Sequence, residues 1–145
     1  MPYHKNVIEF PLSGVWSFFD FGYPNGTNPI EDWYQELSDD GKLHFDGLLK
    51  GNHKTENPSN WIGFRRYMKG KLKEEKIWEL VFSADGRQYR VLCKCGSIRK
   101  QAILLIGCYH KGQVYTPADA LETAYKRAKA LSEERLHERK IRYDL

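Results

Sequence analysis

The sequence of 145 residues predicts a single α+β domain, in which a pair of helices precedes a small antiparallel sheet and a last helix follows it. Two observations predict this order. Three strand-like segments joined by short turns lie between residues 77 and 109. Signals for the start of a helix stand before and after them, at Asn28 and at Thr116. With 41% hydrophobic residues the chain can bury a core of its own.

Residues 1–28 form an aromatic, glycine-rich N-terminal extension of this domain. Residues 7–10 and 15–21 are expected to be strands, and the PNGTN segment at 24–28 is a turn or loop because of its Pro, Asn and Gly content. Aromatic side chains here can stack on bases, but we expect them to fill the core. They are Phe10, Trp16, Phe18, Phe19, Phe21 and Tyr23.

A helix is expected to begin after Asn28, which suits the N-cap, with Pro29 at the first helical position and Glu31 at the third. Apolar residues follow at helical spacing up to Leu37, and the run Asp39-Asp40-Gly41 is expected to end the helix. A second short helix over residues 43–49 would complete a helical hairpin.

Residues 51–60 read as a polar loop, and residues 61–76 as either a short helix or an irregular crossover into the sheet. The basic residues of this crossover are candidates for phosphate contact, but a solvated face is the more common reason for such residues. They are Arg65, Arg66, Lys69, Lys71 and Lys73.

The sheet is predicted as an antiparallel meander of three strands, over residues 77–83, 87–95 and 101–109. The Asp85-Gly86 pair between the first two is typical of a tight hairpin turn. The third strand contains an ILLI run, which favours burial on both faces of the sheet.

The last helix is expected to open at Thr116, with Pro117 at its first position and Asp119 completing an acidic capping box. An apolar stripe from Leu121 to Leu131 supports it. Residues 132–145 are a charged C-terminal tail, which either continues as an exposed helix or frays.

The charge is divided along the chain. Residues 1–60 hold four Lys/Arg and nine Asp/Glu, whereas residues 61–145 hold nineteen and ten. A basic half favours a polyanionic partner, and a solvated basic surface is the alternative. No apolar run reaches the roughly 20 residues of a membrane-spanning helix, and the N-terminus lacks the apolar core of a signal peptide. We therefore expect a cytoplasmic protein that does not contact a membrane.

The three cysteines are Cys93, Cys95 and Cys108, and an odd number is typical of reduced thiols. Cys93 and Cys95 share a strand face but have no further Cys or His nearby to complete a metal site. No metal and no cofactor is expected.

Taken in order, several short motifs resemble the phage-derived HigB-like branch of the RelE toxin superfamily. The resemblance covers residues 76–131. Its parts are Ile77-Trp78-Glu79-Leu80, Arg87-Gln88-Tyr89-Arg90-Val91-Leu92, Ile103-Leu104-Leu105-Ile106, Tyr109-His110-Lys111, Thr116-Pro117 and Ala124-Tyr125-Lys126-Arg127-Ala128.

This resemblance implies a RelE-like fold, a small twisted antiparallel sheet with helices on one face and a basic concave face opposite. It implies a toxin of a type II toxin–antitoxin module, a ribosome-dependent mRNA endonuclease (mRNA interferase). The partners would be a cognate antitoxin, of the helix-turn-helix kind, together with mRNA and the ribosome.

Metal-independent RNA cleavage needs a base near the 2′-OH, cations on the phosphate and an acid for the leaving oxygen. The resemblance places Arg90 at the phosphate, and Tyr115 where some relatives have an aromatic that acts in proton transfer or base stacking. Relatives commonly have two lysines after an aromatic where this sequence has His110 and Lys111. Lys111 can hold the phosphate, and His110 is the candidate for proton transfer. His110 titrates near neutrality in its unperturbed state. The residues expected to support RNA binding are Arg87, Lys94, Arg99, Lys100 and Tyr109.

The sequence departs from the family pattern where relatives have lysines on the first strand of the meander, because here the polar residue is Glu79. This carboxylate is either a base or a structural residue. Two alternatives therefore stay open: a RelE-fold protein that binds nucleic acid or protein without catalysis, and a gyrase-inhibiting toxin.

Overall fold

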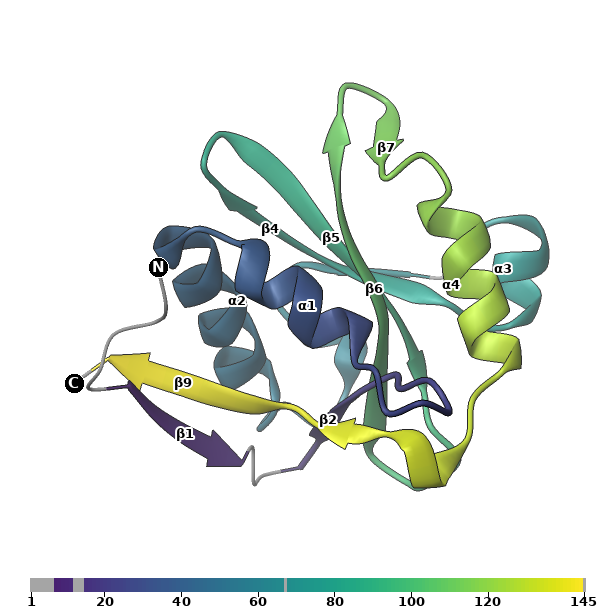
Figure 1. The fold of residues 1–145 in the computed structure, drawn as a ribbon, viewed down its shortest axis with the longest axis horizontal. Coiled ribbons are helices and arrows are strands. Elements are labelled where there is room, and N and C mark those ends of the chain that lie inside the picture. The colour runs from purple at the N-terminus through teal and green to yellow at the C-terminus, as the bar shows by residue number, and fades with distance from the viewer. Residues whose placement is uncertain (1–6, 12–14, 67, 145) are drawn as a thin grey trace.

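The computed structural model describes residues 7–11, 15–66 and 68–144, and it confirms the α+β class. The main sheet has the strand order β3-β4-β5-β6-β2-β8, and β7 pairs with β6 outside this path. Its strands are β2 (Ser17–Asp20), β3 (Phe64–Arg65), β4 (Trp78–Ala84), β5 (Arg87–Cys95), β6 (Gln101–Lys111), β7 (Val114–Thr116) and β8 (His137–Glu138). The helices are α1 (Pro29–Glu36), α2 (Asp39–Asn52), α3 (Gly70–Glu74) and α4 (Ala120–Lys129). Figure 1 shows this arrangement.

The predicted meander of β4, β5 and β6 is present, with both pairs antiparallel. Asp85 and Gly86 have φ angles of 56° and 71° at the β4–β5 turn, the left-handed values that a type I′ hairpin turn requires. From Gln101 to Cys108 every residue of β6 is buried, which confirms that the ILLI strand is covered on both faces. The sheet is not wholly antiparallel, however, because β2 runs parallel to β6.

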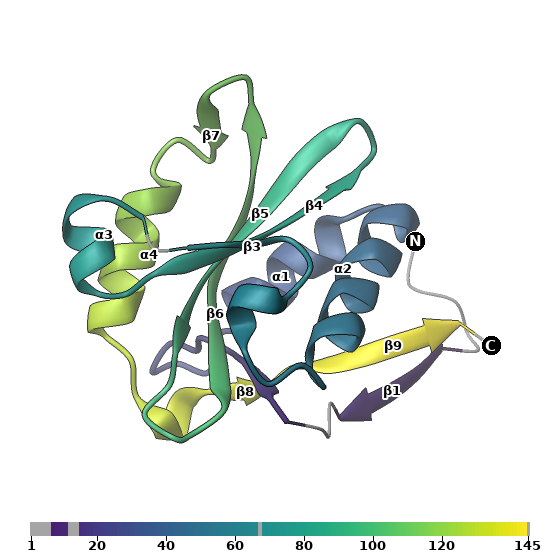
Figure 2. The same ribbon diagram turned by 180° about the vertical axis from the view of Figure 1, so that it is seen from behind.

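Two separate cores cover the two faces of the sheet. α1 and α2 pack on one face, and α4 with α3 lies on the other, as Figures 1 and 2 show from opposite sides. The α1/α2 core contains Tyr34, Phe45 and Leu104, and the α4 core contains Leu105 and Ala124. The face opposite α1 and α2 is therefore not fully open, since α4 covers part of it.

α1 begins as predicted, because the Asn28 side chain accepts hydrogen bonds from the amides of Ile30 and Glu31. The predicted start and length of α2 are wrong. The Ser38 hydroxyl accepts from the Gly41 amide at 2.9 Å, so the Asp-Asp-Gly run is the first turn of α2 rather than the end of α1. Carboxylates in a first turn are favourable because they face the positive end of the helix dipole.

The predicted start of the last helix is also wrong. Thr116 pairs with Tyr109 as the final residue of β7, and α4 begins only at Ala120, after Asp119, whose side chain caps nothing in the part of the chain described. A capping box and a short strand compete for the same Thr, and pairing with β6 prevails.

The charged tail is neither a helix nor a frayed end in its described part. After the 3-10 turn η2 (Glu133–Arg135), β8 pairs with β2, and β9 (Lys140–Asp144) pairs with β1 (Val7–Pro11) in a second, two-stranded sheet. Between them Arg139 is buried and forms ion pairs with Asp20 and Glu31. The N-terminal and C-terminal segments are therefore connected by strand pairing and by the ion pairs of Arg139.

The N-terminal aromatic residues mostly fill the core, as predicted. Trp16, Phe18 and Phe21 are buried, Phe19 is half-buried, and Tyr23 is exposed. The side chain of Phe10 lies outside the described part. In residues 61–76 the crossover holds β3 and α3, and the 3-10 turn η1 (Pro58–Asn60) precedes it. None of the described helices combines the length and apolar character needed to cross a bilayer.

Candidate functional site

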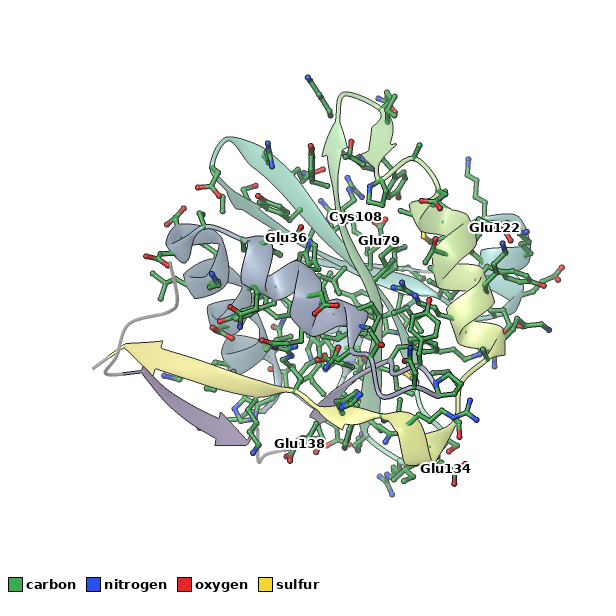
Figure 3. All side chains as sticks on the ribbon, in the orientation of Figure 1. Glu36, Glu79, Cys108, Glu122, Glu134 and Glu138 are labelled. Atoms are coloured by element: carbon green, nitrogen blue, oxygen red, sulfur yellow. The ribbon has the colours of Figure 1, made fainter. Side chains whose placement is uncertain are left out.

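Neighbouring strands direct four polar side chains to one place on the face that α4 partly covers. β4 provides Glu79, β5 provides Arg90, β6 provides His110 and β7 provides Tyr115. Arg90 lies opposite Val81, two residues from Glu79, and His110 lies opposite Tyr115, so side-chain alternation puts all four on one face. We call them the Glu79 cluster. Figure 3 shows Glu79 with Cys108 between the sheet and α4.

Arg90 is held within the cluster by two acceptors. Its Nη1 donates to Glu79 Oε2 at 2.7 Å, and its Nη2 donates to Gln88 Oε1. Both ion-pair side chains are largely buried, with 4% of Glu79 and 16% of Arg90 exposed. Arg90 Nε is buried and finds no acceptor among the described residues. A phosphate bound here would therefore compete with Glu79 for the guanidinium or use its remaining N–H.

Tyr115 is a proton donor within the cluster. Its hydroxyl donates to Glu79 Oε1 at 3.1 Å. Burial raises the pKa of Tyr115 far above its usual value, and the negative charge of Glu79 raises it further. The phenol consequently stays protonated at any physiological pH.

His110 is suited to accept a proton. Burial lowers the pKa of its imidazole, the positive charge of Arg90 lowers it further, and Glu79 opposes them. The ring stands edge-on to Tyr115 with the centroids 4.1 Å apart, and its Nε2 is buried with no hydrogen-bond partner in the described part of the chain. A neutral imidazole is the protonation state that a general base needs near neutral pH.

Lys111 is separated from Arg90, although the sequence assigned both to the phosphate. Alternation along β6 puts Lys111 on the face of Tyr109, and it lines a cavity of about 390 Å³ at the hairpin tips, together with Arg87 and His110. His110 is thus the residue that borders both Lys111 and the Glu79 cluster.

Tyr109 is half-buried and its ring already has partners within the protein, so its role as an RNA-stacking residue stays a prediction. Its ring packs against the α1/α2 core, edge-on to Tyr89 at 5.9 Å. The guanidinium of Arg87 covers the ring at 4.3 Å from its centroid. Arg87 itself is exposed and retains its charge at the cavity edge.

The remaining predicted RNA-binding cations lie toward the other end of β5 and β6. Lys94 forms an ion pair with Glu75 at 2.9 Å, and Lys100 one with Glu56 at 3.6 Å. Arg99 is exposed in the β5–β6 turn. The structure does not bring these three residues to the Glu79 cluster.

A second cavity, of about 400 Å³, opens beside the cluster, and we call it the β3–α4 cavity. Glu79 and Arg90 line it on the sheet side. The other lining residues come from β3, the crossover, α3 and α4, and they are Arg65, Arg66, Met68, Lys69, Leu72 and Leu121. The sequence marked three of these cations as phosphate candidates but gave no sign that they face Glu79. Gln88, Met68 and Leu121 were missed entirely.

The cysteines provide no reactive thiolate in this region. Burial raises the pKa of Cys108, which shares the face of Arg90, to about 12, and the charge of Glu79 adds to the rise. Cys93 is buried on the other face, and burial raises its pKa strongly. The described residues contain no group of three or more His, Cys, Asp or Glu side chains placed to hold a metal ion.

Comparison with known protein families gives a match to the model described as Phage derived protein Gp49-like (DUF891), over residues 37–129. The matched region runs from the end of α1 to the end of α4 and includes the whole Glu79 cluster. The terminal strands β1, β2, β8 and β9 lie outside it. Searches of curated proteins and of solved structures returned no match. Because the family model matches more than half of the chain, the protein belongs to the phage-derived Gp49-like family.

Proposed function

We propose that this protein is a RelE/HigB-like toxin of a type II toxin–antitoxin module that cleaves mRNA on the ribosome. One observation carries the proposal: His110, Tyr115 and Arg90 meet around Glu79 on one face of the sheet, within the family-matched region. These are the residue types that metal-independent RNA cleavage requires. The antitoxin would be a small helix-turn-helix protein encoded in the neighbouring reading frame.

In the proposed reaction the neutral imidazole of His110 removes the proton of a ribose 2′-OH. The 2′-oxygen attacks the adjacent phosphorus, and the bond to the 5′-oxygen breaks, which leaves a 2′,3′-cyclic phosphate and a 5′-hydroxyl. Arg90 stabilises the charge that develops on the phosphoryl oxygens, and Lys111, on the other face of β6, would contact a phosphate further along the strand. Tyr115 supplies the proton to the departing 5′-oxygen, and solvent then restores both side chains to their starting protonation states.

Induced expression in a bacterial host tests this proposal through growth and through mapping of mRNA ends. The wild type should arrest growth and yield cleaved mRNA, and His110→Ala should cleave about 10² times more slowly or worse. Arg90→Ala should also relieve arrest, whereas Lys126→Ala, which removes an exposed charge from α4, should not. Undiminished arrest by both cluster variants would contradict the assignment.

A second candidate function is nucleic-acid binding without cleavage, and one observation favours it. Glu79 offsets the charge of Arg90, and Gln88 occupies a further N–H, so the cluster offers a phosphate less positive charge than a free arginine would. Intact mRNA after induction, together with retained RNA binding, would support this reading over the first.

A further inference from the structure

Unpaired cations gather around the β3–α4 cavity. Elsewhere in the basic half, Lys71 pairs with Glu122 and Lys94 with Glu75. In contrast, the side chains of Arg65, Arg66 and Lys69 form no ion pair or hydrogen bond with any described residue, although all three border the same cavity. Three neighbouring cations without acidic partners raise the local positive potential, which attracts an anionic ligand.

The walls of the cavity favour a ligand whose body is apolar. Met68, Leu72 and Leu121 form the walls, and all three pack on the α4 core. The cavity, at about 400 Å³, lies in the range of small-molecule sites and has room for a nucleobase with its ribose. Apolar walls with a cationic rim match the two halves of a nucleotide, a base with π-faces and a phosphate.

We propose that the β3–α4 cavity binds one unstacked nucleotide of single-stranded RNA, with the base between Met68 and Leu121 and the phosphate on Arg65, Arg66 and Lys69. Glu79 and Arg90 belong both to this cavity and to the Glu79 cluster. The bound nucleotide is therefore a near neighbour of the scissile bond, and the cavity selects the base at that position. The proposal rests on the proposed function only for the identity of the RNA.

An acidic, amphipathic peptide from a protein partner could also contact the three cations and the apolar walls of the cavity. It matches Glu79, on the sheet side of the cavity, less well than a base does. Glu79 Oε2 accepts a hydrogen bond from Arg90 and retains a second lone pair. The edge of a base carries N–H donors for that second lone pair, whereas an aliphatic side chain offers none, and a peptide carboxylate placed beside Glu79 is repelled by it.

Binding of fluorescein-labelled 2′-O-methyl RNA hexanucleotides, in which the attacking 2′-OH is blocked, tests the site by fluorescence anisotropy. Each base in turn is replaced by an abasic residue. For the wild type, the abasic replacement at one position should lower the affinity of the oligonucleotide about tenfold, within the range measured for single stacked bases. In Leu121→Trp, which fills the cavity, the same abasic change should cause no further loss. Met68→Trp fills it from the opposite wall and serves if Leu121→Trp does not fold.

The rim is tested separately through the salt dependence of binding. Arg66→Ala should reduce the slope of log Kd against log salt by about 0.7, as expected for one phosphate contact on a single strand. Lys73→Ala removes an equal charge from the same crossover outside the cavity and should leave the slope unchanged.

Absence of binding, an abasic scan with no sensitive position, or equal losses in the wild type and both filled variants would each overturn the proposal. Displacement of the oligonucleotide by an acidic peptide, with no base-dependent loss, would assign the cavity to a protein partner instead. Since the oligonucleotides cannot be cleaved, a protein that fails to cut mRNA can still pass this test. If the protein cuts mRNA but no abasic replacement lowers its affinity for the oligonucleotide, the nucleotide site is overturned and the proposed function is not.

Discussion

At the scale of single residues, the ion pair between Glu79 and Arg90 decides both the stability of the cluster and its charge. Glu79→Gln keeps the shape and hydrogen-bonding capacity of the side chain but leaves the largely buried Arg90 guanidinium without an opposite charge. Breaking such a pair costs more than forming it contributed, because the remaining ion stays desolvated. We expect the free energy of unfolding to fall by about 1–3 kcal/mol, measured by chemical denaturation.

Glu122→Gln is the matched control, because Glu122 also pairs with a cation, Lys71, but on the surface, where both side chains are more than 40% exposed. Exposed pairs contribute about 0–1 kcal/mol, so this change should be nearly neutral. Equal effects of the two substitutions would show that Glu79 and Arg90 are solvated in solution.

His110 should titrate below the ordinary histidine value, since burial and Arg90 both lower its pKa. We expect NMR titration of its ring protons to show a midpoint below 6.5, which moves upward in Arg90→Gln because the positive charge that lowers the pKa of His110 is removed while Glu79 still raises it. If His110 is the general base, the acid limb of the cleavage rate should follow the same midpoint. A midpoint at or above 6.5 in the wild type would remove the physical reason for that role.

The same shift affects stability. Between the folded pKa of His110 and 6.5, the unfolded chain binds more protons than the folded one, so stability rises with pH across this window and is lost as the pH falls through it. His110→Gln should reduce the slope of the unfolding free energy against pH there, while His53, whose pKa burial also lowers, keeps its own contribution. A profile identical to that of the wild type would contradict the shift.

At the scale of elements, the sequence predicted correctly those strands, turns and helices whose formation depends on interactions between residues close together in the chain. The strands of the meander and the β4–β5 turn follow from side-chain alternation and from the Asp-Gly pair, and α1 follows from its cap at Asn28. The predicted helix starts were wrong at Thr116, which does not cap α4, and at Ser38, which caps α2. Each residue suits a helix N-cap, but which Thr or Ser caps a helix depends on whether a strand elsewhere pairs with it.

The candidate site was predictable only in part for the same reason. Arg90, His110 and Tyr115 were identified by their place in the chain, and their meeting around Glu79 depends on the pairing of four strands. Glu79 itself stood out in the sequence because it is the single charged residue in the apolar run of β4. No local sign connected Leu121 on α4 with Arg65 on β3, because their proximity arises from the packing of α3 against α4.

The strands β8 and β9 show the same dependence on distant partners. Residues 137–144 read as a polar tail because their pairing partners, β2 and β1, lie more than a hundred residues away. Arg139 joins the two ends of the chain, since its Nε donates to Asp20 Oδ1 at 3.1 Å and its Nη2 to Glu31 at 3.0 Å.

Arg139→Met should therefore destabilise the fold by about 3–5 kcal/mol, because it leaves the buried carboxylate of Asp20 without its cation. Adding Asp20→Asn removes that charge and should recover part of the loss in chemical denaturation. Arg135→Met, on the exposed 3-10 turn, is the control and should change little. A small effect of Arg139→Met would mean that the tail is not part of the cooperative unit.

At the scale of the whole molecule, β6 is the strand that joins the two cores. Leu104 lies in the α1/α2 core and Leu105 in the α4 core, and both are fully buried. A shift in the β5–β6 register puts Ile106 in the α4 core as well. A strand covered on one face only would bury one of the two leucines and expose the other. The Glu79 cluster lies on the α4 side, so its geometry depends on a core that the N-terminal helices do not touch.

Leu104→Ala and Leu105→Ala should therefore each destabilise the protein by about 2–5 kcal/mol, through lost burial and the cavity left behind. Val114→Ala, on the neighbouring strand β7 and 62% exposed, should stay within about 0.5 kcal/mol of the wild type.

Chemical denaturation followed by far-UV and near-UV signals checks both the size of each loss and whether the two cores unfold together. A large effect at only one of the two leucines would contradict a strand buried on both faces. Separate transitions for the two signals would contradict a single cooperative domain.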